Sequence, residues 1–129
     1  MPAQTTFAPQ LVIPNGITNV DFYIQAFGAI ELRRVSNSDG SIHVSELSVG
    51  GAIFHLHEET ADPKAFCPKR HDGTTVTIGL FVPDVDAMMN QASAAGGEVI
   101  SPAQDYDYGY RQGKIRDPFG HIWMIEAEF

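Results

Sequence analysis

The sequence is poor in cysteine, in basic residues and in long apolar runs. It contains 1 cysteine among 129 residues, so no disulfide can form within the chain. The lone thiol, Cys67, fits a reducing compartment. No apolar run approaches the roughly 18 residues of a transmembrane helix, and the N-terminus lacks the basic and hydrophobic regions of a secretory signal. These absences predict a cytoplasmic protein with no membrane partner.

Basic residues are also scarce relative to acidic ones. The 8 Lys and Arg face 16 Asp and Glu, which gives a formal net charge of −8 that is spread along the chain. Nucleic-acid binding draws on clustered Lys and Arg that release counterions, so the composition argues against a nucleic-acid partner. A length of 129 residues predicts a single domain, residues 1–129, that buries a core without disulfides.

What the sequence does contain is an internal repeat of secondary structure. In the first half, apolar periodicity and turn residues predict a strand, a helix and three strands at 7–13, 17–27, 30–35, 42–49 and 52–57. Thr18 or Asn19 is expected to cap the helix. In the second half, the same criteria predict a strand, a helix, a short strand and a final strand at 74–82, 85–95, 98–100 and 121–129.

One constant offset of 69 residues aligns the two halves without a gap. It superposes landmark prolines and glycines: Pro14 on Pro83, Gly28 on Gly97, Gly40 on Gly109 and Gly51 on Gly120. Such a match predicts a duplicated βαβββ unit, with repeat one at about 7–58, a linker at about 59–73 and repeat two at about 74–129.

Two segments of this repeat carry a resemblance to a known family. A paired βαβββ unit with Phe22-Tyr23 and Phe27-Gly28-Ala29 in its first helix, and with the turn-and-strand motif at 117–123 (Asp-Pro-Phe-Gly-His-Ile-Trp), resembles the vicinal oxygen chelate superfamily. This superfamily includes glyoxalase I, fosfomycin and bleomycin resistance proteins and extradiol dioxygenases, and the PhnB-like branch is the most similar. The resemblance implies an α+β fold, with two βαβββ repeats forming one domain around a cleft between curved mixed sheets. It also implies a homodimer and a small-molecule ligand.

The same resemblance indicates where a metal would bind. Metal-using members take ligands from the first and last strands of each unit, which fall here on Ala8, His55, Thr77 and Met124. A divalent metal needs about three oxygen or nitrogen donors, which this set lacks. We therefore expect no cofactor and disfavour a divalent metal. A register shift of two residues would instead offer His55, His57 and Glu126, which keeps a metal site open as an alternative.

Strand alternation and the resemblance together predict a set of ligand-binding residues. The cleft would be lined by His55, His57, Thr77, Phe81, Met124 and Glu126, with Tyr108 and Arg111 at its lip. Arg111 would offer its planar guanidinium to a carboxylate or phosphonate. No catalytic residue is assigned.

Two other histidines receive structural interpretations. His43 and Glu46 are separated by an odd number of residues, so alternation predicts that they face opposite ways on their strand. His121 follows the turn glycine, and we expect it to hold the turn.

Three functions fit these observations. The first is a small-molecule-binding or enzyme-like protein of the superfamily without its usual metal and with an unknown substrate. The second is a metal-dependent lyase, isomerase or dioxygenase with the shifted ligands. The third is a sequestration protein of the bleomycin-resistance type, in which an acidic dimer cleft binds a cationic drug. Whether the protein is an enzyme is left open at this point.

Overall fold

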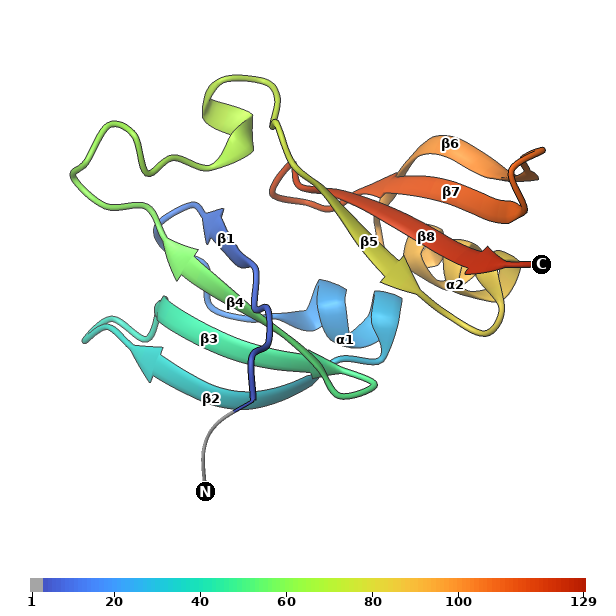
Figure 1. Cartoon of the computed structure of the whole chain (residues 1–129). Helices are drawn as coiled ribbons and strands as arrows, with labels where there is room; N and C mark the ends of the chain where they lie inside the picture. Colours follow the sequence, from blue (N-terminus) through green and yellow to red (C-terminus); the bar gives the residue numbers. More distant parts are fainter. Residues whose placement is uncertain (1–3) are drawn as a thin grey trace.

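The structure, a computed structural model, describes residues 4–129 as two four-stranded mixed sheets and two α-helices (Figure 1). The first half forms β1 (Gln10–Ile13), α1 (Asp21–Phe27), β2 (Ile30–Ser36), β3 (Ile42–Val49) and β4 (Ala52–Glu58). The second half forms β5 (Thr77–Phe81), α2 (Val85–Ala94), β6 (Glu98–Asp105), β7 (Tyr110–Arg116) and β8 (Ile122–Glu128). Within 4–129, no helix is long and apolar enough to cross a membrane. The α+β fold of two βαβββ repeats is therefore confirmed.

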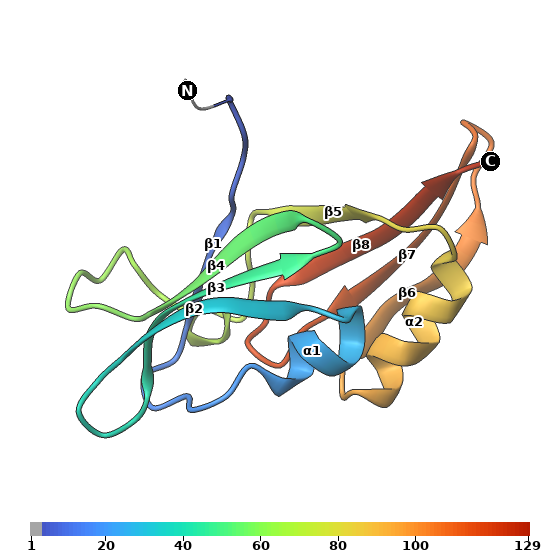
Figure 2. The ribbon, with the colours of Figure 1, turned by 90° about the horizontal axis from the view of Figure 1, so that it is seen from below.

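The sheets and helices form two layers. The strand orders are β1-β4-β3-β2 and β5-β8-β7-β6, and both helices lie on the same side of the sheets (Figure 2). The helices contact each other, and α2 packs against β6, β7 and β8. The sheet surfaces turned away from the helices are called here the first open face, on β1–β4, and the second open face, on β5–β8. Among residues 4–129, no helix or strand covers either face.

Strand register follows the 69-residue offset on some strands and not on others. Gln10 pairs with His55 on parallel strands β1 and β4, and Gly79 pairs with Met124 on β5 and β8. The offset of 69 therefore holds for the first and last strands of both repeats. It fails by one residue on β3 and β7. On β3, Glu46 lies opposite His55, so the offset predicts residue 115 opposite Met124, but Lys114 of β7 occupies that position.

The boundaries differ from the expected ones where local signals are weak. Helix α1 begins at Asp21 rather than at residue 17, and its N-cap is Val20, which supplies no side-chain hydrogen bond. The Asn19 side chain instead accepts a hydrogen bond from the Asp21 amide (3.0 Å), in the lead-in to the helix. Strand β6 continues through Pro102 to Asp105, because it is an edge strand and an edge tolerates the missing proline N–H.

Asp117, at the start of the turn before β8, joins the two repeats through a buried hydrogen-bond network. Its Oδ1 accepts from the backbone amides of Phe119 (2.9 Å) and His121 (3.0 Å). Its Oδ2 accepts from the Tyr23 hydroxyl of α1 (2.7 Å) and from the Trp123 indole N–H (3.0 Å). Burial, and secondarily Asp117, raises the pKa of the Tyr23 hydroxyl well above its ordinary value, so this hydroxyl stays a donor.

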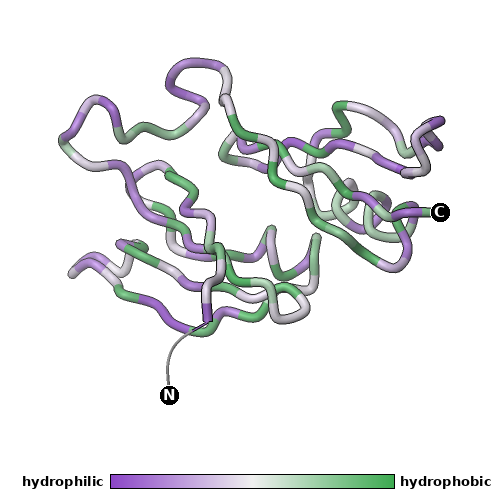
Figure 3. Tube along the Cα trace, in the orientation of Figure 1, coloured by the Kyte–Doolittle hydropathy of each residue, from purple (hydrophilic) through white to green (hydrophobic). Residues whose placement is uncertain are grey.

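His121 also spans the boundary between the repeats, contrary to the purely local role expected for it. Its backbone amide holds the turn, but its ring Nε2–H donates to the Val12 carbonyl of β1 (2.7 Å). The segment between β4 and β5 lies nearby and is hydrophilic along much of its length (Figure 3). From it, the buried Cys67 thiol donates to the Phe119 carbonyl (3.0 Å). Burial raises the pKa of this thiol, so it is a packing group and not a reactive one.

Candidate functional site

The second open face carries several of the predicted binding residues. Strand alternation on β8 turns Trp123 and Ile125 into the core and leaves Met124 and Glu126 on the open face. On neighbouring β5, Gly79 lies opposite Met124 and Phe81 lies opposite Glu126. The sequence therefore builds this face from residues that the core does not use.

Glu126 is an unusual residue for an open sheet face because it is only 8% exposed. Its Oε1 accepts a hydrogen bond from the Gln112 side-chain amide (2.8 Å), and the Gln112 carbonyl oxygen accepts one from the Tyr108 hydroxyl. Its Oε2 lies over Gly79, where an added Cβ would stand 2.6 Å away. Glycine at this position therefore makes room for the carboxylate, and among residues 4–129 no hydrogen bond ends on Oε2.

An aromatic wall stands beside this carboxylate. The Tyr106 and Tyr108 rings stack with centroids 5.3 Å apart, and Tyr110 continues the row from Tyr108 (5.8 Å) to Phe81 (6.1 Å). Desolvation, and then the nearby Tyr106, Glu126 and Asp107, raises the pKa of the Tyr108 hydroxyl. A hydrogen bond to Glu128 does most to raise the pKa of Tyr110. The Tyr108 and Tyr110 hydroxyls therefore remain neutral donors at physiological pH.

A cavity of about 170 Å³ opens on this face, below the tyrosines. The residues that line it are Ser101, Tyr106, Tyr108, Gln112, Gly113, Lys114 and Met124. Of these, Tyr108 and Met124 belong to the predicted binding set. Ser101, Gln112, Gly113 and Lys114 received no role from the sequence, because no bounds were assigned to β7 and β6 was expected to stop at residue 100; the alternation of Gln112 and Lys114 could have pointed to them.

The first open face carries histidine–carboxylate pairs. His55 Nε2 lies 2.9 Å from Glu46 Oε2, and both residues line a cavity of about 160 Å³ with Arg33, Val35 and Val44. His57 Nδ1–H donates to the backbone carbonyl of Glu58 (2.6 Å). An imidazole paired with a carboxylate, as His55 is, can bind a ligand or transfer a proton.

The expectation that His43 and Glu46 face opposite ways is wrong. His43 packs edge-on against His57 with ring centroids 5.0 Å apart, so it shares the first open face with Glu46. The reason is a shift in the β2–β3 register beside Ile42. The next fully buried residue of β3 is Ser45, which is three positions after Ile42 instead of two. A β-bulge resets alternation in this way.

The prediction that Arg111 offers its guanidinium to a ligand requires that this group be free, and it is not free. Its nitrogens lie 2.7 Å from Asp86 of α2 and 3.0 Å from Asp105 of β6. Hydrogen bonds to Asp86 and then Asp105 raise the pKa of Arg111. The side chain thus ties α2 to the sheet.

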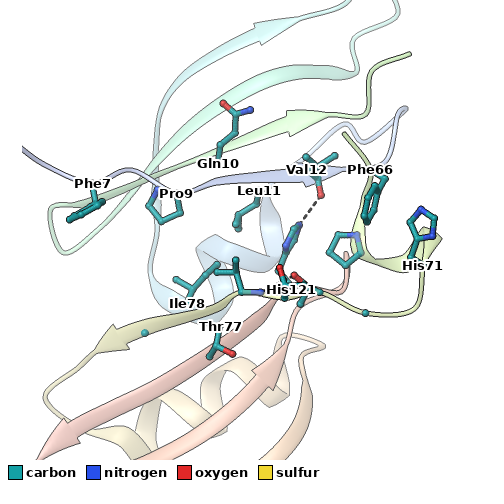
Figure 4. A pocket seen from close by; sticks show the side chains of 16 residues that line it. Phe7, Pro9, Gln10, Leu11, Val12, Phe66, His71, Thr77, Ile78 and His121 are labelled. Carbon is teal, nitrogen blue, oxygen red and sulfur yellow. Dashed lines mark hydrogen bonds between the residues drawn. The ribbon is translucent and has the colours of Figure 1, made fainter. Parts of the chain in front are cut away.

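The structure separates the remaining predicted residues into three places. His55 lines the first-face cavity, and Tyr108 and Met124 line the second-face cavity beside Glu126 and Phe81. Thr77 lines a groove of about 790 Å³ between β1 and β5, whose walls include Phe7, Leu11, Val76 and Ile78 (Figure 4). Within one chain, His55 and His57 therefore lie on a different sheet from Met124 and Glu126.

The donor positions implied by the metal-using relatives do not fit a metal here. Alanine offers no donor, the Met124 thioether is a poor ligand for a hard or borderline cation, and His55 is engaged by Glu46. Nowhere in residues 4–129 do three His, Cys, Asp or Glu side chains come together as a possible metal site.

Comparisons with known proteins agree on one family. Residues 10–125 match the sequence profile described as the Glyoxalase/Bleomycin resistance protein/Dioxygenase superfamily. The uncharacterized protein Mb0911c of Mycobacterium bovis is 36% identical over 125 residues, covering 95% of this chain and 82% of that protein. An uncharacterized protein of Arabidopsis thaliana, At5g48480, is 30% identical over 114 residues, covering 82% of this chain and 68% of that protein.

Solved structures share the fold. TioX from Micromonospora sp. ML1 superposes with a TM-score of 0.72 at 26% identity, covering 96% of this chain and 100% of TioX. The fosfomycin resistance protein FosX from Listeria monocytogenes superposes with a TM-score of 0.71 at 16% identity, covering 99% and 96%. At that identity, the likeness to FosX concerns the fold alone and says nothing about the substrate.

Proposed function

Because the chain belongs to the glyoxalase/bleomycin resistance protein/dioxygenase superfamily, we propose that it binds a small molecule on its second open face without the divalent metal that many members use. Within the superfamily we assign it to the PhnB-like branch, on the strength of the motif Asp117–Trp123. The ligand would enter the cavity below the tyrosines, between Tyr108, Gln112 and Met124.

The observation that supports this proposal best is the arrangement around Glu126. This carboxylate is 8% exposed, and Gln112 engages one of its oxygens. The other oxygen keeps contact with solvent, because no side-chain oxygen buried within 4–129 is left without a hydrogen-bond partner. The hydrogen bonds from the Tyr108 hydroxyl to Gln112 and from Gln112 to Glu126 hold the Gln112 side chain in place in the wall of the cavity. Stacked tyrosines beside it supply apolar contact area with little loss of side-chain entropy.

We further propose that the protein acts as a homodimer. Large apolar side chains remain exposed on the first sheet, including Ile30 (65%) and Leu32 (49%), and the groove between β1 and β5 is walled by apolar residues. Apolar surface of this extent on a single chain marks an interaction site. In a two-fold dimer, the first open face of one copy would close over the second open face of its partner and complete the ligand site.

A ligand screen on chelator-treated protein tests the proposal. Thermal-shift measurements of the wild type are compared with Tyr108→Ala and Glu126→Gln, and with Glu98→Gln as a matched control on the exposed strand β6. We expect hits that raise the melting temperature of the wild type and the control and lose most of their effect in the two site variants. Hits that bind all four proteins equally would place the site elsewhere, and hits that require Zn²⁺ or Mn²⁺ would favour the metal-dependent alternative.

A further inference from the structure

The cavity on the second open face holds a cationic group without a protein partner. Lys114 is half-buried on β7 and lines this cavity, yet it forms no ion pair with any residue of 4–129. The other lysines of the chain, Lys64 and Lys69, lie in the segment between β4 and β5. A half-buried ammonium without a counterion can bind an anion without first breaking an ion pair to the protein.

The opposite end of the cavity is an acceptor site. Gln112 stands two residues before Lys114 on the same face of β7, which separates the two by roughly 6.8 Å along the strand. The side-chain oxygen of Gln112 accepts a hydrogen bond from the Tyr108 hydroxyl and has a second lone pair for a ligand, while its amide nitrogen donates to Glu126 Oε1. Glu126 itself does not line the cavity, and its Oε2 lies over Gly79 of β5. Between these two ends, Met124 forms the floor opposite Lys114, and Tyr106 and Tyr108 form an aromatic side wall.

We propose, as a refinement that rests on the proposed function, that this cavity binds a planar aromatic carboxylate with a hydrogen-bond donor at its far end. The carboxylate pairs with the Lys114 ammonium, the ring lies on Met124 beside the tyrosines, and the donor reaches the side-chain oxygen of Gln112. The cavity of about 170 Å³ is smaller than the roughly 300–1,000 Å³ typical of drug-sized sites, so it selects a single ring over a fused system. Cationic ligands are disfavoured because Lys114 would repel them.

The test uses three probes that differ by one feature: 4-hydroxybenzoate, its neutral amide 4-hydroxybenzamide, and benzoate, which lacks the donor. Each is titrated by calorimetry into the wild type, Lys114→Met and Lys64→Met. Methionine keeps the length of the lysine stem, and Lys64→Met removes the same charge from an exposed loop. Unchanged circular dichroism and melting temperature establish that the variants are folded.

We expect the wild type and Lys64→Met to bind 4-hydroxybenzoate about tenfold more tightly than the amide, as one charge-assisted hydrogen bond at a partly exposed site provides. Lys114→Met should lose this preference, and benzoate should bind more weakly than 4-hydroxybenzoate. Equal binding of acid and amide, a preference that survives Lys114→Met, or no binding of the acid at millimolar concentration would overturn the inference. In each of those cases, screen hits of other chemistry that depend on Tyr108 would still support the proposed function.

Discussion

Replacing Gly79 by alanine should separate ligand binding from stability. Gly79 lies on β5 opposite Met124 and beneath the Glu126 carboxylate, and its backbone is extended, so alanine fits the strand. The added Cβ would stand 2.6 Å from Glu126 Oε2, whereas ordinary contacts begin at 3.4 Å. The carboxylate must therefore move by about 0.8 Å. Because only the flexible end of a side chain is displaced, the fold itself can absorb the change.

Gly79→Ala should affect ligand binding more than it affects stability. Replacing glycine by alanine in an extended strand stabilises by about 0.4–1 kcal/mol through the unfolded chain, which offsets part of the loss of the 2.8 Å Gln112–Glu126 bond. The melting temperature should thus change by no more than about 3 °C. Ligand affinity should fall about tenfold, because the displaced carboxylate no longer holds Gln112, whose side-chain oxygen receives the ligand's donor.

Calorimetric titration with 4-hydroxybenzoate and thermal unfolding measure the two effects on the same preparations. Gly73→Ala is the matched control, because an added Cβ there meets no atom within 4 Å. Affinity that is equal in the wild type, Gly79→Ala and Gly73→Ala would refute the role given to Glu126. A collapse of the melting temperature in Gly79→Ala would show instead that the Glu126 carboxylate is held rigidly for stability.

Two further predictions concern the framework of the site. Asp117→Asn should lower the free energy of unfolding by about 3 kcal/mol in urea denaturation, because an amide nitrogen cannot accept from both Tyr23 and Trp123. Asp107→Asn, at an exposed turn residue, should change the free energy of unfolding by less than about 0.5 kcal/mol. Equal effects of the two substitutions would contradict the role of the hydrogen-bond network around Asp117. Hydrogen bonds from His43, and then from Asn15 and Asn37, lower the pKa of Glu58 in the folded protein. The contribution of Glu58 to stability is therefore complete above its unfolded-state pKa of about 4.3, and it is lost as the pH falls through the lower folded-state pKa. The difference in melting temperature between wild type and Glu58→Gln should accordingly be largest near neutral pH and shrink in acid, and a pH-independent difference would argue against it.

The fold could be predicted from the sequence because its signals are local and repeated. Strand β3 was expected at 42–49 and is found at Ile42–Val49, since turn residues flank a run of strand formers. The offset of 69 residues survives as the register of the first and last strands. It fails on the third strands, where the β3–β4 hairpin turns through Gly50-Gly51 and the β7–β8 hairpin uses the longer turn at 117–121.

The site was harder to predict because its geometry depends on contacts between segments far apart in the sequence. Alternation placed Met124 and Glu126 on one face, but it could not reveal that Gln112 holds Glu126 or that Asp86 holds Arg111. A bulge near Ile42, which no residue type announces, brought His43 and Glu46 to the same face. Nor does alternation say which faces of two sheets meet, and in one chain the histidines and Glu126 belong to separate sheets.

The most direct test of the account is a calorimetric titration of 4-hydroxybenzoate into wild-type protein that has been stripped with a chelator, repeated after adding Zn²⁺ and then Mn²⁺. The account predicts saturable binding to the stripped protein with the same affinity in all three titrations, because the binding groups are Lys114, the tyrosines and Gln112. Binding that appears only after a metal is added would contradict it.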